Sequence, residues 1–160
     1  MSRLPVIAFV AATALASDGT GAQQADTYAA DLGRVYEATQ FIQAAKEGCD
    51  VAEPETRAPN EVAYIAWRKR HQSLLDELER RFTAMIRRAS TDQQDYTKKV
   101  GKYAGEVLEH LEAMKKEFLA QGPQDVARQC RDFPEYLKSK DADLRKRYAD
   151  ELKMIRKRKL

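Results

Sequence analysis

The sequence has little of what catalytic and metal sites are usually built from. Its 160 residues include two cysteines, two histidines and one tryptophan. No serine lies in a Gly-x-Ser-x-Gly turn, no Cys-x-x-Cys-His haem attachment occurs, and no glycine-rich phosphate loop follows a strand-like segment. Neither histidine has the Glu-x-x-His spacing of di-iron bundles. We therefore expect a protein that is not an enzyme and that holds no metal and no cofactor.

Long hydrophobic runs are also absent, except at the N-terminus. The segment Leu4–Ala16 carries no charge. It is too short to span a bilayer as a mature helix, but it has the length of the apolar region of a signal peptide. Small-residue cleavage sites precede Ser17 and Gln23, and the polar residues before the second site favour it. The sequence thus predicts a cleaved signal peptide over 1–22 and one periplasmic or secreted domain over 23–160; a disordered or membrane-anchoring N-terminus is the alternative.

The two cysteines, Cys49 and Cys130, stand about eighty residues apart. In an oxidising compartment an isolated pair most simply forms a disulfide. A cysteine-based metal site would need further ligands close by, and none accompany them. We therefore predict a structural disulfide that joins distant parts of the chain.

The spacing of apolar residues predicts four amphipathic helices. The most continuous is Glu61–Ala89, where apolar residues recur at steps of three and four and charged residues fill the other face. Similar stripes occupy 24–47 and 92–121. A fourth helix begins at Pro123, and Pro134 is expected to kink or break it. Short connections then favour an all-α, elongated four-helix up-down-up-down bundle.

The ends of the first two helices follow from glycine and proline. Gly48 is expected to end the first helix. Pro54 and Pro59 bracket a segment without helical periodicity, which predicts a loop before the second helix. In an up-down bundle the end of the first helix and the start of the fourth lie at the same pole, which would place Cys49 beside Cys130.

Trp67 and His71 lie one turn apart on the apolar stripe of the second predicted helix. A neutral imidazole there can hydrogen-bond to a neighbour in the core, or it can bind a metal or haem. We favour a core histidine. The alternative is a carrier that holds a small apolar ligand or a metal in the bundle core near these two residues.

Two glycines, Gly101 and Gly105, interrupt the third predicted helix, although each costs up to about 1 kcal/mol relative to alanine. Their small-x-x-x-small spacing leaves a shallow groove where another helix can approach closely. We favour a helix of the same bundle as its occupant over a helix from a partner.

Positive charge is concentrated at the C-terminus. From Lys138 to Leu160 there are ten lysines or arginines against four acidic residues, whereas the whole chain carries +3. A helix dipole accounts for cations only in the last turn. The remainder indicates binding to an anionic envelope surface or an acidic protein, and not to nucleic acid, because interleaved aromatic residues are missing. The residues of this predicted basic surface are Arg145, Lys146, Arg147, Arg156, Lys157, Arg158 and Lys159. Neutralising the last four is expected to leave the melting temperature almost unchanged.

The segment Cys130–Leu152 resembles the helical repeat of secreted lysozyme-inhibitor domains over about a seventh of the chain. Pro134 and Glu135 followed by Asp141, Leu144 and Tyr148 carry the resemblance, and the additional cysteines of that family are absent. It implies a secreted helical inhibitor. The sequence as a whole predicts an exported, non-catalytic binding protein that acts as an adaptor, inhibitor or chaperone-like factor and is not an integral membrane protein.

Overall fold

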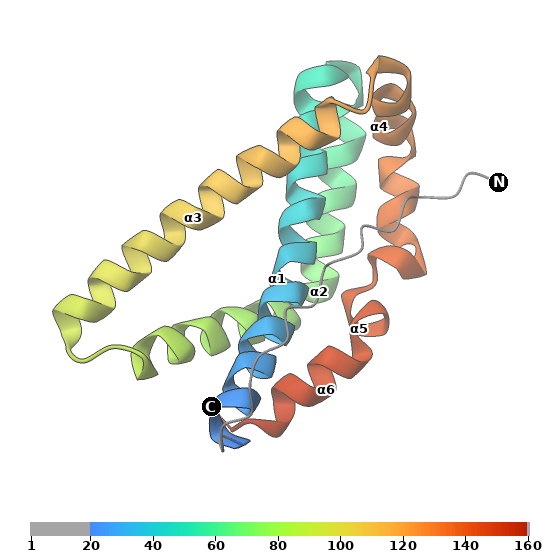
Figure 1. The fold of residues 1–160 in the computed structure, drawn as a ribbon. Coiled ribbons are helices and arrows are strands. Elements are labelled where there is room, and N and C mark those ends of the chain that lie inside the picture. The colour runs from blue at the N-terminus through green and yellow to red at the C-terminus, as the bar shows by residue number, and fades with distance from the viewer. Residues whose placement is uncertain (1–19, 160) are drawn as a thin grey trace, which may run out of the picture.

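The computed structural model describes residues 20–159, and this part of the chain is helical throughout, with no strand (Figure 1). The elements are α1 (Thr20–Ala52), the 3₁₀ helix η1 (Pro54–Thr56), α2 (Arg57–Arg88), α3 (Gln93–Leu119), α4 (Pro123–Lys138), the 3₁₀ helix η2 (Lys140–Ala142), α5 (Leu144–Arg147) and α6 (Ala149–Lys157). The all-α prediction is confirmed. Most of the predicted signal peptide, residues 1–19, lies outside the described part. Within 20–159 no helix is both long enough and apolar enough to cross a membrane.

The longest helix, α1, is the element around which the others pack. It contacts α2, α3, α4 and α6, and it passes through the middle of the molecule (Figure 1). Side chains at helical spacing are buried over most of its length, namely Tyr28, Leu32, Val35, Ile42, Ala44, Ala45 and Cys49. The hydrophobic core therefore runs along α1, with neighbours on several sides of it.

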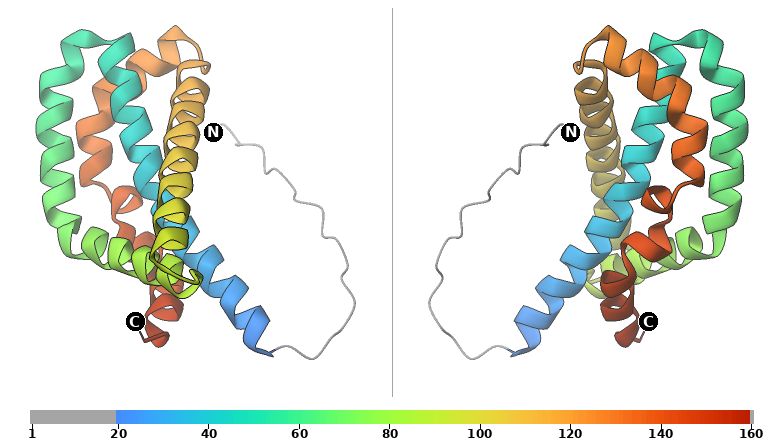
Figure 2. Two further views of the ribbon diagram at one scale, coloured as in Figure 1. Left: turned by 90° about the vertical axis from the view of Figure 1, so that its left-hand side faces the viewer. Right: turned by 90° about the vertical axis from the view of Figure 1, so that its right-hand side faces the viewer.

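A regular four-helix bundle is not confirmed, although the long helices alternate in direction along the chain. The second half of α2 bends away from the first, and α3 leans outward from α4 (Figures 1 and 2). On α3, Leu111 and Phe118 near the C-terminal end are buried, whereas Val100 in the other half is exposed. The C-terminal half of α3 is thus the part that is best packed on the core.

The predicted loop between Pro54 and Pro59 is wrong, because this segment is almost entirely helical. After α1 ends at Ala52, one 3₁₀ turn leads directly into α2, which starts at Arg57. Pro54 opens η1, and Pro59 lies in the first turn of α2. Both are positions where a missing N–H removes no helical hydrogen bond. The two prolines lie at the starts of η1 and α2, so the lack of a helical hydrophobic pattern in this segment did not indicate a loop.

Gly48 does not end α1, which continues for another turn. A Cβ atom at this position would lie 2.6 Å from Cδ1 of Phe118, which is buried on α3. Real Cβ atoms do not approach a rigid ring so closely. Gly48 is therefore a packing glycine that lets α3 lie close to α1.

The fourth predicted helix is broken, but not at Pro134. Helix α4 continues across Pro134, and the break comes five residues later, at Ser139. The Ser139 hydroxyl accepts a hydrogen bond from the N–H of Asp141, and the Asp143 carboxylate accepts one from the N–H of Arg145. These side chains cap new helical turns and offer the backbone partners outside α4. The break is set by the capping residues.

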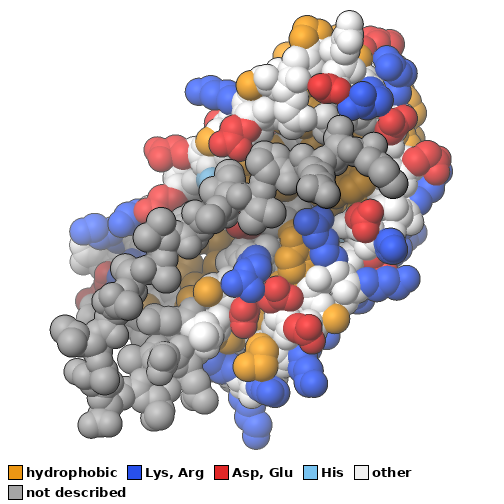
Figure 3. Space-filling view, turned by 45° about the vertical axis from the view of Figure 1, so that its right-hand side comes forward, with side chains coloured by type: hydrophobic (Ala, Val, Ile, Leu, Met, Phe, Trp, Pro, Cys, Tyr) orange, Lys and Arg blue, Asp and Glu red, His pale blue; other side chains and the backbone are white. Residues whose placement is uncertain are grey.

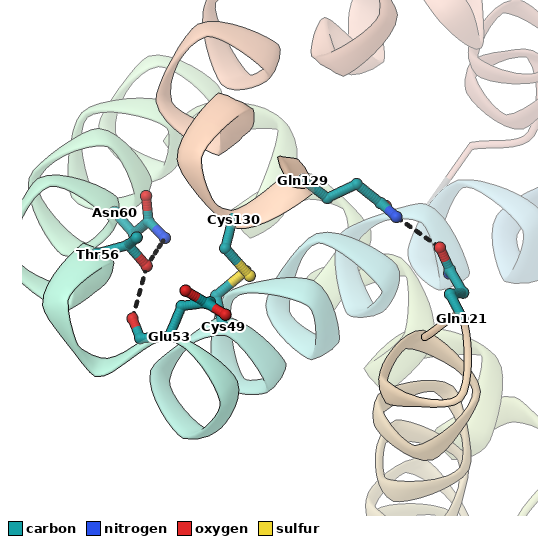
Figure 4. Close-up of a disulfide and its surroundings, with 7 residues drawn as sticks. All are labelled: Cys49, Glu53, Thr56, Asn60, Gln121, Gln129 and Cys130. Atoms are coloured by element: carbon teal, nitrogen blue, oxygen red, sulfur yellow. Dashed lines mark hydrogen bonds between the residues drawn. A yellow bond between two sulfur atoms is a disulfide. The ribbon is translucent and has the colours of Figure 1, made fainter. Parts of the chain in front are cut away.

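Cys49 on α1 and Cys130 on α4 form a disulfide with a Cα–Cα distance of 5.3 Å, as predicted (Figure 4). Both cysteines are fully buried. Beside them, Asn60 Nδ2 donates to Thr56 Oγ1, which donates to the carbonyl of Glu53. The bridge joins the end of α1 to α4, and the hydrogen bonds order the turn between α1 and α2.

Candidate functional site

An apolar groove lies between α1, α3 and α4, and sequence reasoning did not find it. It consists of two adjoining cavities of about 250 and 290 Å³, and Phe41 and Tyr136 line both. Its apolar walls are formed by Ala38, Phe41, Ile42, Ala45, Met114, Phe118, Phe133, Tyr136, Leu144 and Tyr148. Three helices and the start of α5 thus bring together an aromatic surface that no single stretch of sequence contains.

Phe41 is the most exposed aromatic side chain of the groove. It lies off the buried stripe of α1 and is 46% exposed, whereas the neighbouring Ile42 is buried. Charged side chains such as Arg34 and Arg147 stand at the rim. Figure 3 shows hydrophobic side chains in a hollow among charged ones on this face. An exposed ring inside a hollow with a polar rim is the arrangement that binding sites use.

Tyr136 and Tyr148 add hydroxyl groups to the groove wall. Burial raises the pKa of Tyr136, although the charge of Arg147 opposes this effect. Tyr136 is therefore neutral at physiological pH and can donate one hydrogen bond to a bound group. The groove offers this polar contact within an otherwise apolar wall.

A second hollow, of about 380 Å³, lies between α1, the bent half of α2 and α3. The rings of Tyr36, Phe82 and Tyr103 pack together on one side of it, with Phe82 centred 4.8 Å from Tyr36 and 5.2 Å from Tyr103. Across the hollow, His110 Nε2 lies 3.4 Å from a carboxylate oxygen of Glu37. The ring contacts join α1, α2 and α3 at this hollow, whereas a surface pair such as His110 and Glu37 contributes little.

Trp67 and His71 are buried together where α2 meets η2 and α5. The indole N–H of Trp67 donates to the carbonyl of Ala142 at 2.8 Å. Nδ1 of His71 lies 3.0 Å from the carbonyl of Trp67, and Nε2 accepts the N–H of Leu144 at 3.3 Å. A ring with its hydrogen on Nδ1 makes both contacts, so both ring nitrogens have partners, and a carboxylate oxygen of Asp143 lies 3.6 Å from Nε2. The geometry agrees with a core histidine.

Potential metal ligands do not gather elsewhere in residues 20–159. No group of three or more histidine, cysteine or acidic side chains is placed so that it could hold a metal ion within this part of the chain. The described residues therefore offer no arrangement from which a metal centre can be argued.

Contrary to expectation, no helix of the described residues 20–159 packs closely on Gly101 and Gly105. A Cβ atom built on either glycine meets nothing within 4 Å. Leu108, one turn further along α3, is 63% exposed. This face of α3 is left uncovered by the described chain.

Arg156 of the predicted basic surface forms a tight ion pair with Glu77 on α2. Nη2 of Arg156 lies 2.7 Å from Oε2, and Nε lies 3.1 Å from both carboxylate oxygens. The hydrogen bonds from Arg156 are the main cause that lowers the pKa of Glu77, and Arg81 adds to them. Arg81 also donates to the carbonyls of Ile155 and Arg158, which holds the end of α6. The expectation that neutralising this tail leaves stability unchanged is therefore inconsistent with its contacts.

Other cations of the predicted basic surface also contact the protein. Arg145 donates to the Ser73 hydroxyl at 2.6 Å, and Lys146 lies 3.8 Å from the Asp143 carboxylate. The remaining contacts are those of Arg147 with the Asp141 carbonyl, Arg158 with the Tyr28 ring and Lys157 with the Met154 sulfur. Within residues 20–159 the side chains of Lys157 and Lys159 have no acidic partner. The predicted surface thus divides into structural cations, which pair with other parts of the protein, and two available cations, Lys157 and Lys159, which can bind an external anion.

No protein-family model matches this chain, and comparisons with curated proteins and with solved structures find no match either. The resemblance of the segment from Cys130 to lysozyme-inhibitor domains consequently receives no support from them. The features of the described chain that bear on its function are the groove, the uncovered face of α3 and the basic C-terminus.

Proposed function

We propose that this protein is an exported, non-catalytic binding protein that takes an apolar segment of a partner protein into the groove between α1, α3 and α4. The observation that carries the proposal is the exposed ring of Phe41 inside a hollow lined by further aromatic side chains. Adaptor, inhibitor and chaperone-like roles all rest on such binding. The disulfide is consistent with export, because exported proteins reach oxidising compartments in which disulfides persist.

The dimensions of the groove support this proposal. Its two cavities, of about 250 and 290 Å³, adjoin at Phe41 and Tyr136. Together they reach the range of about 300 to 1,000 Å³ that is typical of binding pockets. Burying a partner's apolar side chains there would remove the groove's own exposed rings from water, which is the main source of binding free energy.

The alternative carrier near Trp67 and His71 has weaker support. Trp67 is 2% exposed, its N–H is hydrogen-bonded, and both nitrogens of His71 have partners. A metal at His71 would have to displace these contacts, and the cavity of about 260 Å³ that Trp67 lines has the charged side chains of Arg68, Asp76 and Glu79 in its wall. We therefore place the ligand in the groove and treat Trp67 and His71 as structural.

Replacing Phe41 with Asp should abolish most binding at the groove. Burial of a phenyl side chain contributes about 1.5–3 kcal/mol to binding, so its loss should weaken the affinity by about tenfold or more. Ile65→Asp is the matched control, because Ile65 is 56% exposed on α2 and lines neither cavity. Titration of both variants with the apolar dye anilinonaphthalene sulfonate, alongside circular dichroism, measures the difference.

Photo-cross-linking distinguishes a protein partner from a small ligand. Benzoylphenylalanine placed at Phe41 should give covalent adducts with another protein in the native envelope, and the same group at Ile65 should not. Equal dye affinity in Phe41→Asp and Ile65→Asp would overturn the groove as the binding site. Dye binding that depends on Phe41 without any protein adduct would instead assign the groove to a small apolar ligand.

The available cations of the basic C-terminus provide a second candidate contact, with an anionic surface. Lys157→Gln together with Lys159→Gln should weaken binding to phosphatidylglycerol vesicles and flatten its dependence on salt, because screening shortens from about 10 Å at 0.1 M to about 3 Å at 1 M. The melting temperature should not change, since neither side chain pairs with an acidic residue in the described part of the chain. Equal salt dependence of vesicle binding in the parent and the double variant would mean that these lysines are solvated and take no part in binding.

Arg156→Gln is the structural counterpart in the same experiment. It should lower the free energy of unfolding by about 1 kcal/mol, because Glu77 loses its strongest partner. The pKa of Glu77 is lower in the folded protein than its ordinary value of 4.5. The ion pair therefore contributes its full stabilisation above pH 4.5, and this stabilisation is lost as the pH falls through the lowered pKa. Urea unfolding at pH 7 and at pH 3 should therefore show a larger difference from the parent at pH 7.

A further inference from the structure

The outer face of α3 has a narrow waist at Gly101 and Gly105, where this face carries no side chains, and charged residues on either side of it. Lys98, Gly101, Gly105, Glu109 and Glu112 follow one another at steps of three and four, so they lie on one side of the helix, and all are exposed. The waist is open, because a Cβ at either glycine meets nothing within 4 Å. Helix α3 lies on one outer side of the molecule, and no other helix of residues 20–159 lies outside it (Figure 2).

The charges next to the waist differ in sign on its two sides. Lys98 precedes the glycines, Glu109 and Glu112 follow them, and the exposed Lys116 comes one turn after Glu112. Lys102, between the glycines, lies 3.6 Å from Glu106 of the same helix. Lys98 and Glu109 have no ion-pair partner among residues 20–159, and Glu112 pairs only with Lys115 on its own helix. The exposed Leu108 lies beside the waist. A partner helix with the reverse order of charges would complement this face.

The same helix from a second copy of this chain, running antiparallel, has that order of charges. If the two-fold axis passes near Gly105, Lys98 of one copy lies opposite Glu112 of the other, and the pair occurs twice. Lys116 then lies opposite the uncharged Gln94. A parallel arrangement would instead set Lys98 against Lys98 and Glu112 against Glu112. The glycines at the crossing point allow the helix backbones to approach closely.

We propose that this face of α3 is a self-association surface through which two copies of the chain form an antiparallel, two-fold symmetric dimer. Self-complementary charge identifies a second copy as the partner. A contact between single helices is at the small end of specific interfaces, so the dimer is weak, with a micromolar dissociation constant. The inference is independent of the groove proposed above, because the α3 residues that line the groove, Met114 and Phe118, lie on the opposite side of that helix.

Sedimentation velocity over a concentration series tests the dimer. Lys98→Glu should raise the dissociation constant by about tenfold, because two symmetric pairs become repulsive. Adding Glu112→Lys to the same chain should restore the parent value. The two residues lie about 20 Å apart along one helix, so restoration reports a contact between chains. Phe41→Asp should leave association unchanged.

Gly105→Gln provides an independent check, because a longer side chain fits the isolated chain but blocks the close approach of a second helix. The variant should be a monomer with an equal or higher melting temperature, since glutamine favours helix over glycine. A parent that remains monomeric at millimolar concentration would overturn the proposal. So would a Lys98→Glu variant that associates like the parent, or a charge swap that fails to restore association.

Discussion

Removing the bridge between Cys49 and Cys130 is expected to lower the free energy of unfolding by about 4 kcal/mol. The disulfide joins residues 81 apart in the sequence, so it greatly restricts the unfolded chain. Without it the unfolded state gains conformational entropy, while the packing of α1 on α4 remains. Urea denaturation of the Cys49→Ala/Cys130→Ala variant, followed by circular dichroism, measures this loss.

The reduced parent is the control for this experiment. It should unfold at the same urea concentration as the double alanine variant, because both lack the constraint. The slope of free energy against urea should rise in both, since an unbridged chain exposes more surface on unfolding. A loss below about 1 kcal/mol would mean that the unfolded state is compact without the bridge.

The disulfide was predictable because two facts from the sequence converged on it. An isolated cysteine pair suggested bonding, and helical stripes of similar length placed Cys49 and Cys130 at one pole. The details of the helix ends were less accessible. Pro54, Pro59 and Pro134 all suggested interruptions, yet proline disturbs a helix only where it removes an internal hydrogen bond or clashes with the preceding turn. The break at Ser139 depends on the capping side chains of Ser139 and Asp143. Their role becomes evident only when the positions of η2 and α5 are known.

The groove could not be predicted from helical periodicity, because its residues belong to different helices. Periodicity identifies the buried face of each helix, but it does not say how far neighbouring helices stand apart. One signal was available, since Phe41 is a large aromatic residue off the stripe of α1. Gly48 was misinterpreted for a related reason. Its role depends on Phe118, which comes seventy residues later in the chain.

The basic C-terminus shows the limit of arguments from charge alone. Composition marks Arg156 and Lys157 as equivalent cations, yet Arg156 contacts Glu77 on α2, whereas Lys157 has no acidic partner among the residues that the structure describes. Only the fold decides which cation is structural. The order of charge along α3 is visible in the sequence, but its meaning required the finding that this face is uncovered.

Replacing His71 with Phe is expected to lower the free energy of unfolding by about 3 kcal/mol. His71 is 1% exposed, and its Nε2 is the acceptor for the backbone N–H of Leu144, which is equally buried. A phenyl ring has a similar size but cannot accept a hydrogen bond. The variant therefore leaves a buried donor without a partner at the start of α5.

Gln is the matched replacement at the same position. Its amide oxygen can reach the place of Nε2 and accept the N–H of Leu144, so His71→Gln should lose only about 1 kcal/mol. Urea denaturation of the two variants separates the hydrogen bond from the shape of the ring. If His71→Phe is as stable as His71→Gln, the bond to Leu144 contributes nothing and packing against Trp67 is what matters. Loss of dye binding by a fully folded His71→Gln variant would instead mean that His71 belongs to a ligand site.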